Sequence, residues 1–105
     1  MTMPLINIES EHGHVHMVLS GEIDLDTAPA VEAKLLGALQ SDTSAVTVEL
    51  SGVTYVDSIG MRMLFQLATR LTAREVPFAV VAQKGSIARR VIELSGLTTV
   101  ASLKP

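Results

Sequence analysis

Apolar residues in this chain follow two different spacings, and segments of the two kinds take turns along the sequence. Val46, Val48 and Leu50 stand two residues apart, as in a strand with one buried face, whereas residues 58–73 carry apolar side chains at helical spacing. Two strand-like segments come first, and helical and strand-like segments then alternate to the end. This order predicts an α/β fold in which helices pack on a mixed β-sheet through right-handed crossovers.

The first two strand-like segments, residues 5–10 and 14–20, are separated by Gly13 and are expected to form a hairpin. The second segment alternates apolar with mostly polar residues, so one of its faces must meet a layer of helices. The apolar positions on that face are Val15, Met17 and Leu19.

Three helices are expected between and after the later strands. The first begins at Thr27 or Ala28, because Pro29 is tolerated in a first helical turn, where its missing N–H costs nothing. The second runs from Ser58 to about residue 73, and the third follows Ser86, a residue type that caps helices well.

The last third of the chain predicts two more strands around the third helix. Residues 78–82 are apolar throughout, which is typical of a strand covered on both faces, and residues 98–100 are expected to form an edge strand. Gly96 is expected to end the helix in the left-handed conformation. The residues expected to be buried by this helix are Ile87, Val91 and Leu94, and those expected to be exposed are Arg89, Arg90 and Glu93.

The amino-acid composition limits which functions the protein can have. A chain of 105 residues with 48% hydrophobic residues predicts a single domain, residues 1–105, around one core.

The eight Lys and Arg residues are scattered, which argues against nucleic acid as a partner. No apolar run approaches the ~20 residues of a membrane-spanning helix. The start of the chain lacks the features of a secretory signal, so a cytoplasmic location is expected. The absence of cysteine excludes thiol nucleophiles and cysteine-bound metals.

Two stretches carry a resemblance to a known family. They are Gly21-Glu22-Ile23-Asp24 followed by Thr27-Ala28-Pro29, and the segment from Glu49 to Val56 that continues into Asp57-Ser58-Ile59-Gly60. Together they resemble the STAS domain of sulfate transporters and anti-sigma factor antagonists, over nearly the whole chain. The resemblance implies the STAS fold, a mixed β-sheet of about four to five strands with three to four helices packed on it.

The antagonist branch of that family implies a function for Ser58. By resemblance, an anti-sigma factor with serine kinase activity binds the unphosphorylated protein and releases a sigma factor. Phosphorylation of Ser58 then abolishes binding, and a separate serine phosphatase resets the cycle. Ile59 and Met61 stand where the family often has a hydroxyl residue and Leu, which leaves Ser58 as the only hydroxyl in its tetrapeptide.

The start of the second helix is the predicted partner-binding surface. A phosphate on Ser58 would be tolerated by the helix N-terminus but would add charge beside Asp57. Ile59 and Met63 are expected to be exposed next to Arg62, forming a docking patch. Gly60 is expected to let a partner approach the backbone. The full predicted set is Asp24, Asp57, Ser58, Ile59, Gly60, Met61, Arg62 and Met63.

Simpler interpretations compete with this one. Asp57 or Ser58 can serve only as a helix cap. His12, His14 and His16 alternate as in a metal site, although Gly13 is expected to turn the chain between the first two. The remaining motifs with a weaker chemical interpretation are the carboxylates Glu22, Asp24 and Asp26, and Lys84-Gly85-Ser86 as a phosphate site.

An enzyme is not expected. A hydrolase with Ser58 as nucleophile would need glycine where Val56 stands, and every histidine lies near the N-terminus. No cofactor, metal ion or catalytic residue is therefore predicted, and the protein is expected to be a monomer or weak dimer. The alternative function is an accessory STAS subunit of a lipid-transporting ABC system, which would need no phosphorylation.

Overall fold

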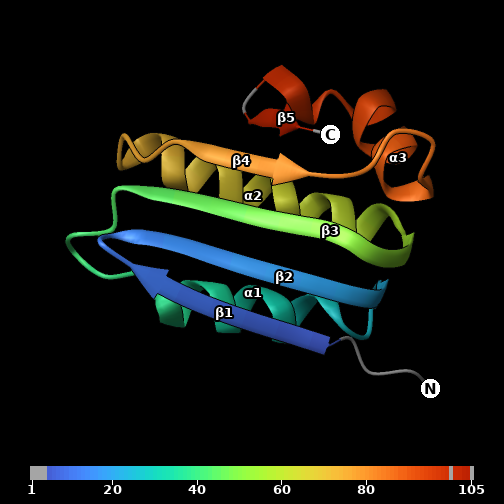
Figure 1. The fold of residues 1–105 in the computed structure, drawn as a ribbon. Coiled ribbons are helices and arrows are strands. Elements are labelled where there is room, and N and C mark those ends of the chain that lie inside the picture. The colour runs from blue at the N-terminus through green and yellow to red at the C-terminus, as the bar shows by residue number, and fades with distance from the viewer. Residues whose placement is uncertain (1–4, 100, 105) are drawn as a thin grey trace.

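Five strands form one sheet in the order β1-β2-β3-β4-β5 (Figure 1). The computed structural model describes residues 5–99 and 101–104. The strands are β1 (Leu5–Glu11), β2 (His14–Ile23), β3 (Ala45–Val56), β4 (Phe78–Val81) and β5 (Ser102–Lys104). β1 is antiparallel to β2, and the strands from β2 to β5 are parallel to one another. The predicted mixed sheet is confirmed.

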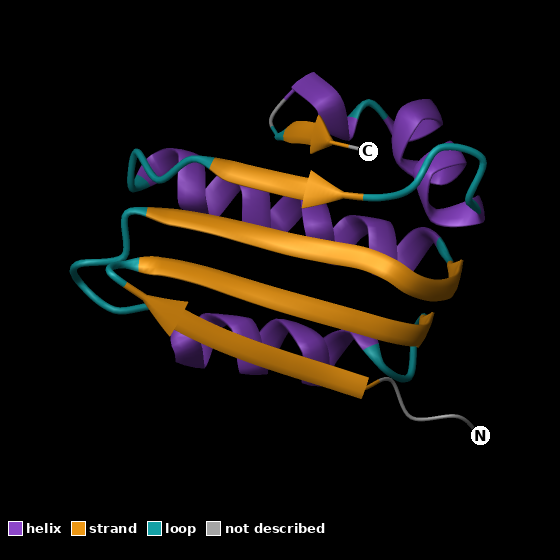
Figure 2. Cartoon of the chain, in the orientation of Figure 1, coloured by secondary structure: helices purple, strands orange, loops and turns teal. Residues whose placement is uncertain are grey.

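The helices cover one face of this sheet (Figure 2). Helix α1 (Ala28–Ala38) lies behind β1 and β2, and α2 (Ser58–Ala73) lies behind β3 and β4. Helix α3 (Ile87–Ser95) follows β4, and a 3-10 helix, η1 (Leu97–Thr99), leads toward β5. Among the described residues no helix covers the opposite face of the sheet, and no helix is long and apolar enough to cross a membrane.

The hairpin between β1 and β2 turns at His12 and Gly13. Both residues have a positive φ, 52° and 82°, as the two-residue turns that match strand twist require. The predicted turn is confirmed, and it places His12 off the strand that carries His14 and His16.

The core lies between the sheet and α1 and α2. The apolar face of β2 is buried as predicted, and its side chains pack with those of both helices. In β4, by contrast, Phe78 and Val80 are buried while Ala79 and Val81 are only half-buried. The prediction that this strand is covered on both faces is therefore wrong, because the helices of residues 5–99 and 101–104 pack on one side of the sheet only.

Helix α3 turns a different face to the core than its sequence predicts. Ala88 and Ile92 are buried, whereas Ile87 is 61% and Leu94 80% exposed. Arg89, predicted to be exposed, is half-buried. Its guanidinium donates a hydrogen bond to the carbonyl oxygen of Ala82, just after β4, at 2.9 Å. The expected burial of Ile87 and Leu94 is therefore wrong.

The edge strand predicted at residues 98–100 is also misplaced. Residues 97–99 form η1, with Leu97 buried, and the strand follows at Ser102–Lys104. The hydroxyl of Thr99 donates to the carbonyl oxygen of Gly96 at 2.8 Å, which favours a helical turn over an extended chain. Val100 lies outside the described residues.

Two neighbouring residues of β2 test the placement of the core. Leu19→Ala is expected to lower the free energy of unfolding by about 2 to 5 kcal/mol, because the buried side chain leaves a cavity. Val18→Ala, on the partly exposed opposite face, is expected to cost less than about 1 kcal/mol. Urea unfolding of both variants measures the difference. Equal losses would contradict a sheet that is covered on one face.

Candidate functional site

The predicted site lies where β2 and β3 end side by side. In the parallel pairing of these strands Ile23 is the partner of Val56, so the segments that follow each strand leave the sheet at the same edge. After Ile23 comes the loop to α1, and after Val56 come Asp57 and the start of α2. Loops at the carboxyl ends of parallel strands are a common place for binding sites.

Asp57 joins these two segments. Its Oδ1 accepts a hydrogen bond from the Gly60 N–H at 2.8 Å, which caps α2, and its Oδ2 accepts one from the Leu25 N–H at 3.0 Å. Its own N–H donates to the carbonyl oxygen of Ile23 at 3.2 Å. The interpretation of Asp57 as a helix cap is confirmed, and the same carboxylate also holds the neighbouring loop.

The loop before α1 is built around Asp24 and Thr27. Asp24 Oδ1 accepts from the N–H groups of Asp26 and Thr27 at 3.0 and 3.1 Å. The buried hydroxyl of Thr27 donates to the Glu22 carbonyl oxygen at 2.8 Å and accepts from the Asp24 N–H. Asp24 therefore orders its own loop, and the link to the start of α2 runs through the backbone of Leu25. The Asp-x-x-Thr spacing is the sequence signal for this structural role of Thr27.

Ser58 is the first residue of α2 and is exposed. Because Asp57 supplies the cap, the Ser58 hydroxyl is not needed to begin the helix. Ser58 and Arg62 both line an apolar groove between α2 and α3. The serine is thus accessible at the positive end of a helix dipole.

Three apolar members of the predicted set are less accessible than Ser58 and Arg62. Met63 is only 5% exposed, because it lies on the side of α2 that faces α1, and Ile59 beside it is half-buried. The expected exposure of Met63 is wrong. Met61 is also buried, which leaves Arg62 as the exposed side chain of the predicted docking patch.

Gly60 serves the packing of the protein itself. A methyl group at this position would lie 2.6 Å from the carbonyl oxygen of Ile23 and 3.1 Å from a methyl carbon of Val56. Gly60 is buried and allows the first turn of α2 to rest directly on the ends of β2 and β3. The predicted approach of a partner to the Gly60 backbone is therefore wrong.

Comparison with known proteins assigns the family. A model described as "Mlab, STAS domain" matches residues 6–104. The chain belongs to the STAS family. The fold agrees, because the mixed sheet of five strands with its helices also occurs in the unphosphorylated form of the anti-sigma factor antagonist SpoIIAA. That structure is 17% identical, with a TM-score of 0.73 over 96% of this chain and 88% of the other, and it shows the fold alone.

More similar members of the STAS family carry a regulatory name. The anti-sigma-F factor antagonist RsfB of Mycobacterium tuberculosis is 33% identical over 92 residues, which cover 88% of this chain and 74% of the relative. The crystal structure of an anti-sigma factor antagonist from Mycobacterium paratuberculosis is 31% identical, with a TM-score of 0.84 over 97% of this chain and 86% of that one.

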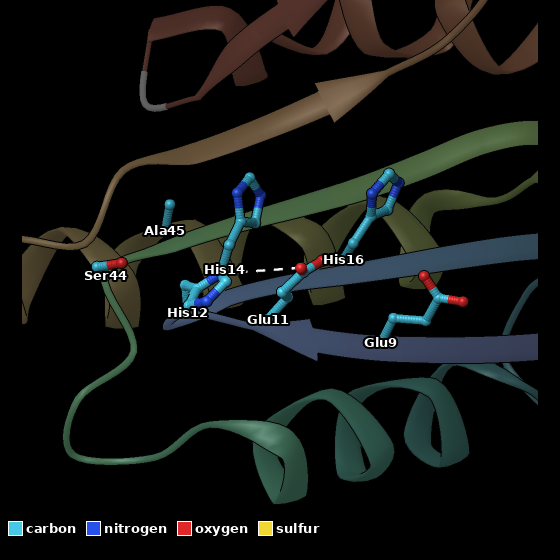
Figure 3. Close-up of a pocket in the computed structure, with 7 residues that line it drawn as sticks. All are labelled: Glu9, Glu11, His12, His14, His16, Ser44 and Ala45. Atoms are coloured by element: carbon cyan, nitrogen blue, oxygen red, sulfur yellow. Dashed lines mark ion pairs between the residues drawn. The ribbon is translucent and has the colours of Figure 1, made fainter.

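A second polar site lies on the face of the sheet opposite the helices, at the end near the β1–β2 turn (Figure 3). The rings of His14 and His16 stack with centroids 6.4 Å apart. His14 Nε2 lies 2.9 Å from Thr47 Oγ1, and His16 Nε2 lies 3.3 Å from Glu49 Oε2. His12 sits in the turn beside Glu11. No group of three or more potential ligands among the described residues is placed to hold a metal ion.

The segment considered as a phosphate site is an ordinary helix start. Ser86 Oγ accepts from the Arg89 N–H at 3.1 Å and caps α3, and Gly85 has a φ of 84° that suits a turn before the helix. The Arg89 side chain is already bonded to the end of β4. Nothing in these contacts distinguishes the segment from a structural connection.

The role of Gly60 in packing is tested by replacing it with Ala and comparing the result with the same change at Gly37, another helical glycine. Gly60→Ala is expected to lower the free energy of unfolding by about 1 to 3 kcal/mol, since the added methyl group collides with the Ile23 carbonyl. Gly37→Ala in α1, where the added carbon has no atom within 4 Å apart from its chain neighbours and the nearby backbone of α1, is expected to raise it by up to about 1 kcal/mol. Thermal or urea unfolding measures both. A Gly60→Ala protein as stable as the wild type would contradict the close packing of α2 on β2.

Proposed function

We propose that this STAS protein is an anti-sigma factor antagonist whose binding to its anti-sigma factor is switched off by phosphorylation of Ser58. The observation that carries the proposal is the division of roles at the start of α2. Asp57 makes the structural hydrogen bonds, and Ser58 stands beside it exposed. The names of the Mycobacterium relatives support the same function.

The chemistry of the proposed switch belongs to the partners. The anti-sigma factor acts as a serine kinase and transfers the γ-phosphoryl group of ATP to the Ser58 oxygen, which loses its proton, and ADP leaves. A serine phosphatase hydrolyses the phosphoserine back to serine and inorganic phosphate. This protein is the substrate of both reactions, and the proposal places it in the cytoplasm, where sigma factors act.

A phosphate on Ser58 is compatible with the fold. The N-terminus of a helix stabilises a negative group by about 0.3 to 1 kcal/mol, which helps to offset repulsion by the neighbouring Asp57 carboxylate. The hydrogen bonds of Asp57 go to backbone N–H groups that need no contribution from Ser58. Phosphorylation therefore changes the charge of the surface while the cap that holds α2 in place remains.

The effect on a partner is larger than the effect on the fold. Phosphorylation adds a charge of about −1.5 to −2 at an exposed position, and a partner surface shaped around a neutral hydroxyl then loses both fit and electrostatic complementarity. A loss of about 3 kcal/mol of binding free energy weakens affinity more than a hundredfold. A single phosphate is enough for an on–off switch.

The proposed partner surface combines residues that touch the partner with residues that hold them. Ser58 and Arg62 are exposed on α2 beside the half-buried Ile59, and Leu25, 64% exposed, stands on the adjoining loop. The other members of the predicted set shape this surface from below or from the side. They are Asp24, Asp57, Gly60, Met61 and Met63.

The switch is tested with purified anti-sigma factors of the same genome, ATP and three variants. We expect mass spectrometry to locate one phosphate on Ser58, and calorimetry to show that phosphorylated protein and Ser58→Asp bind at least about a hundredfold more weakly than unmodified protein. Ser58→Ala is expected to bind but to accept no phosphate.

Thr72→Asp is the control, because it adds the same charge to an exposed position of α2 about 21 Å from Ser58. It is expected to bind within about threefold of the wild type, since exposed charges at that distance are largely screened. Phosphorylated protein that binds as tightly as unmodified protein would refute the switch. An accessory subunit of a transporter would bind no anti-sigma factor in any form.

A further inference from the structure

The groove between α2 and α3 is lined by apolar side chains at the margin of the core, where Met61 is buried and Phe65 and Val91 are half-buried. Its apolar surface comes from Phe65 of α2 and from Val91 and Leu94 of α3, and Ser58 and Arg62 stand along it. Leu94 is the most exposed large apolar residue of the described chain, at 80%. A leucine left in water beside two other apolar side chains forms a patch that an apolar group of a partner can cover.

One cationic side chain, Arg62, stands at the groove in a protein with a net charge of −3. Helix α2 contains Arg62 and Arg70 but no Asp or Glu. Both arginines are exposed, and neither takes part in the three ion pairs found among residues 5–99 and 101–104. Of the two, only Arg62 lines the groove, which therefore combines apolar contact area with one exposed guanidinium that forms no ion pair among the described residues. This combination complements a segment that carries apolar and acidic side chains.

We propose, resting on the proposed function, that this groove receives a segment of the anti-sigma factor in which an apolar side chain packs on Leu94 and a neighbouring Asp or Glu pairs with Arg62. Arg is well suited to this role because its planar guanidinium binds carboxylates through two parallel hydrogen bonds. The occupant is thus an acidic, amphipathic segment.

The position of Ser58 explains how phosphorylation would empty the groove. Ser58 and Arg62 are four residues apart on α2, so they are neighbours on the helix surface, and both line the groove. A phosphate on Ser58 lies within reach of the guanidinium and competes with the carboxylate of the partner for it. The partner's carboxylate then faces a second anion at close range, and binding is lost.

Two pairs of variants test the groove, and each pair changes the same chemistry inside and outside it. Leu94→Ala is compared with Ile87→Ala, because both residues are exposed on α3 but only Leu94 lines the groove. Arg62→Gln is compared with Arg90→Gln, an exposed arginine of α3 that does not line it. None of the four side chains is buried, so all four proteins are expected to unfold at nearly the wild-type urea concentration.

Calorimetric titration of the anti-sigma factor is expected to show about tenfold weaker binding for Leu94→Ala and for Arg62→Gln, and changes within about threefold for the two controls. Arg62→Lys is expected to recover part of the loss. The affinity of the wild type is expected to fall between 50 mM and 500 mM salt more steeply than that of Arg62→Gln, since salt screens the ion pair.

The outcomes separate this inference from the proposed function. If phosphorylation of Ser58 releases the anti-sigma factor but Leu94→Ala and Arg62→Gln bind as their controls do, the switch stands and the groove is not the docking site. A stronger complex of Arg62→Gln would show that the partner segment is basic and would overturn the assignment of an acidic one. If no anti-sigma factor binds unmodified protein, both the function and its docking site are refuted.

Discussion

The hydrogen bonds of the Asp57 carboxylate hold together the part of the molecule on which the rest of the site depends. One oxygen caps α2 through Gly60, and the other takes the N–H of Leu25 from the loop after β2. A single side chain thus fixes the start of one helix relative to the loop that leads into another. Because β2 and β3 are parallel and end together, this bridge is short enough for one aspartate to make.

On the proposed function, that arrangement assigns structure and regulation to two adjacent residues. A serine at the cap position would use its hydroxyl oxygen to accept the hydrogen bond that begins the helix, so one oxygen would serve both the cap and the phosphorylation. Here Ser58 stands one residue beyond the cap, at a position where side chains point outward and where the dipole favours negative charge. The same hydroxyl can therefore change the surface without changing the backbone that presents it.

The sequence predicts most of this site because its determinants are local. The strand pattern of β3, the cap at Asp57 and the apolar spacing of α2 occupy one continuous stretch, and the predicted bounds of α2 match those observed. The sequence does not predict the burial of Met63 and Gly60, because the residues that cover them come from distant segments. Met63 is covered by α1, and Gly60 is confined by the end of β2. Helical spacing shows which side of a helix a residue occupies but not what lies against that side.

In helix α3 as well, helical spacing alone does not predict which apolar residues are buried, and the exposed Leu94 lines the groove. Its apolar residues at helical spacing predict a buried face, yet the core takes Ala88 and Ile92 and leaves Leu94 exposed. Periodicity cannot distinguish an apolar face that packs on the core from one that lines a groove, since both exclude water when they are occupied. Local rules tend to fail where a residue serves function rather than folding. The exposed Leu94 lies across the groove from Ser58 and Arg62. In the proposed complex its apolar side chain gives the partner contact area beside the residue whose phosphorylation releases the partner.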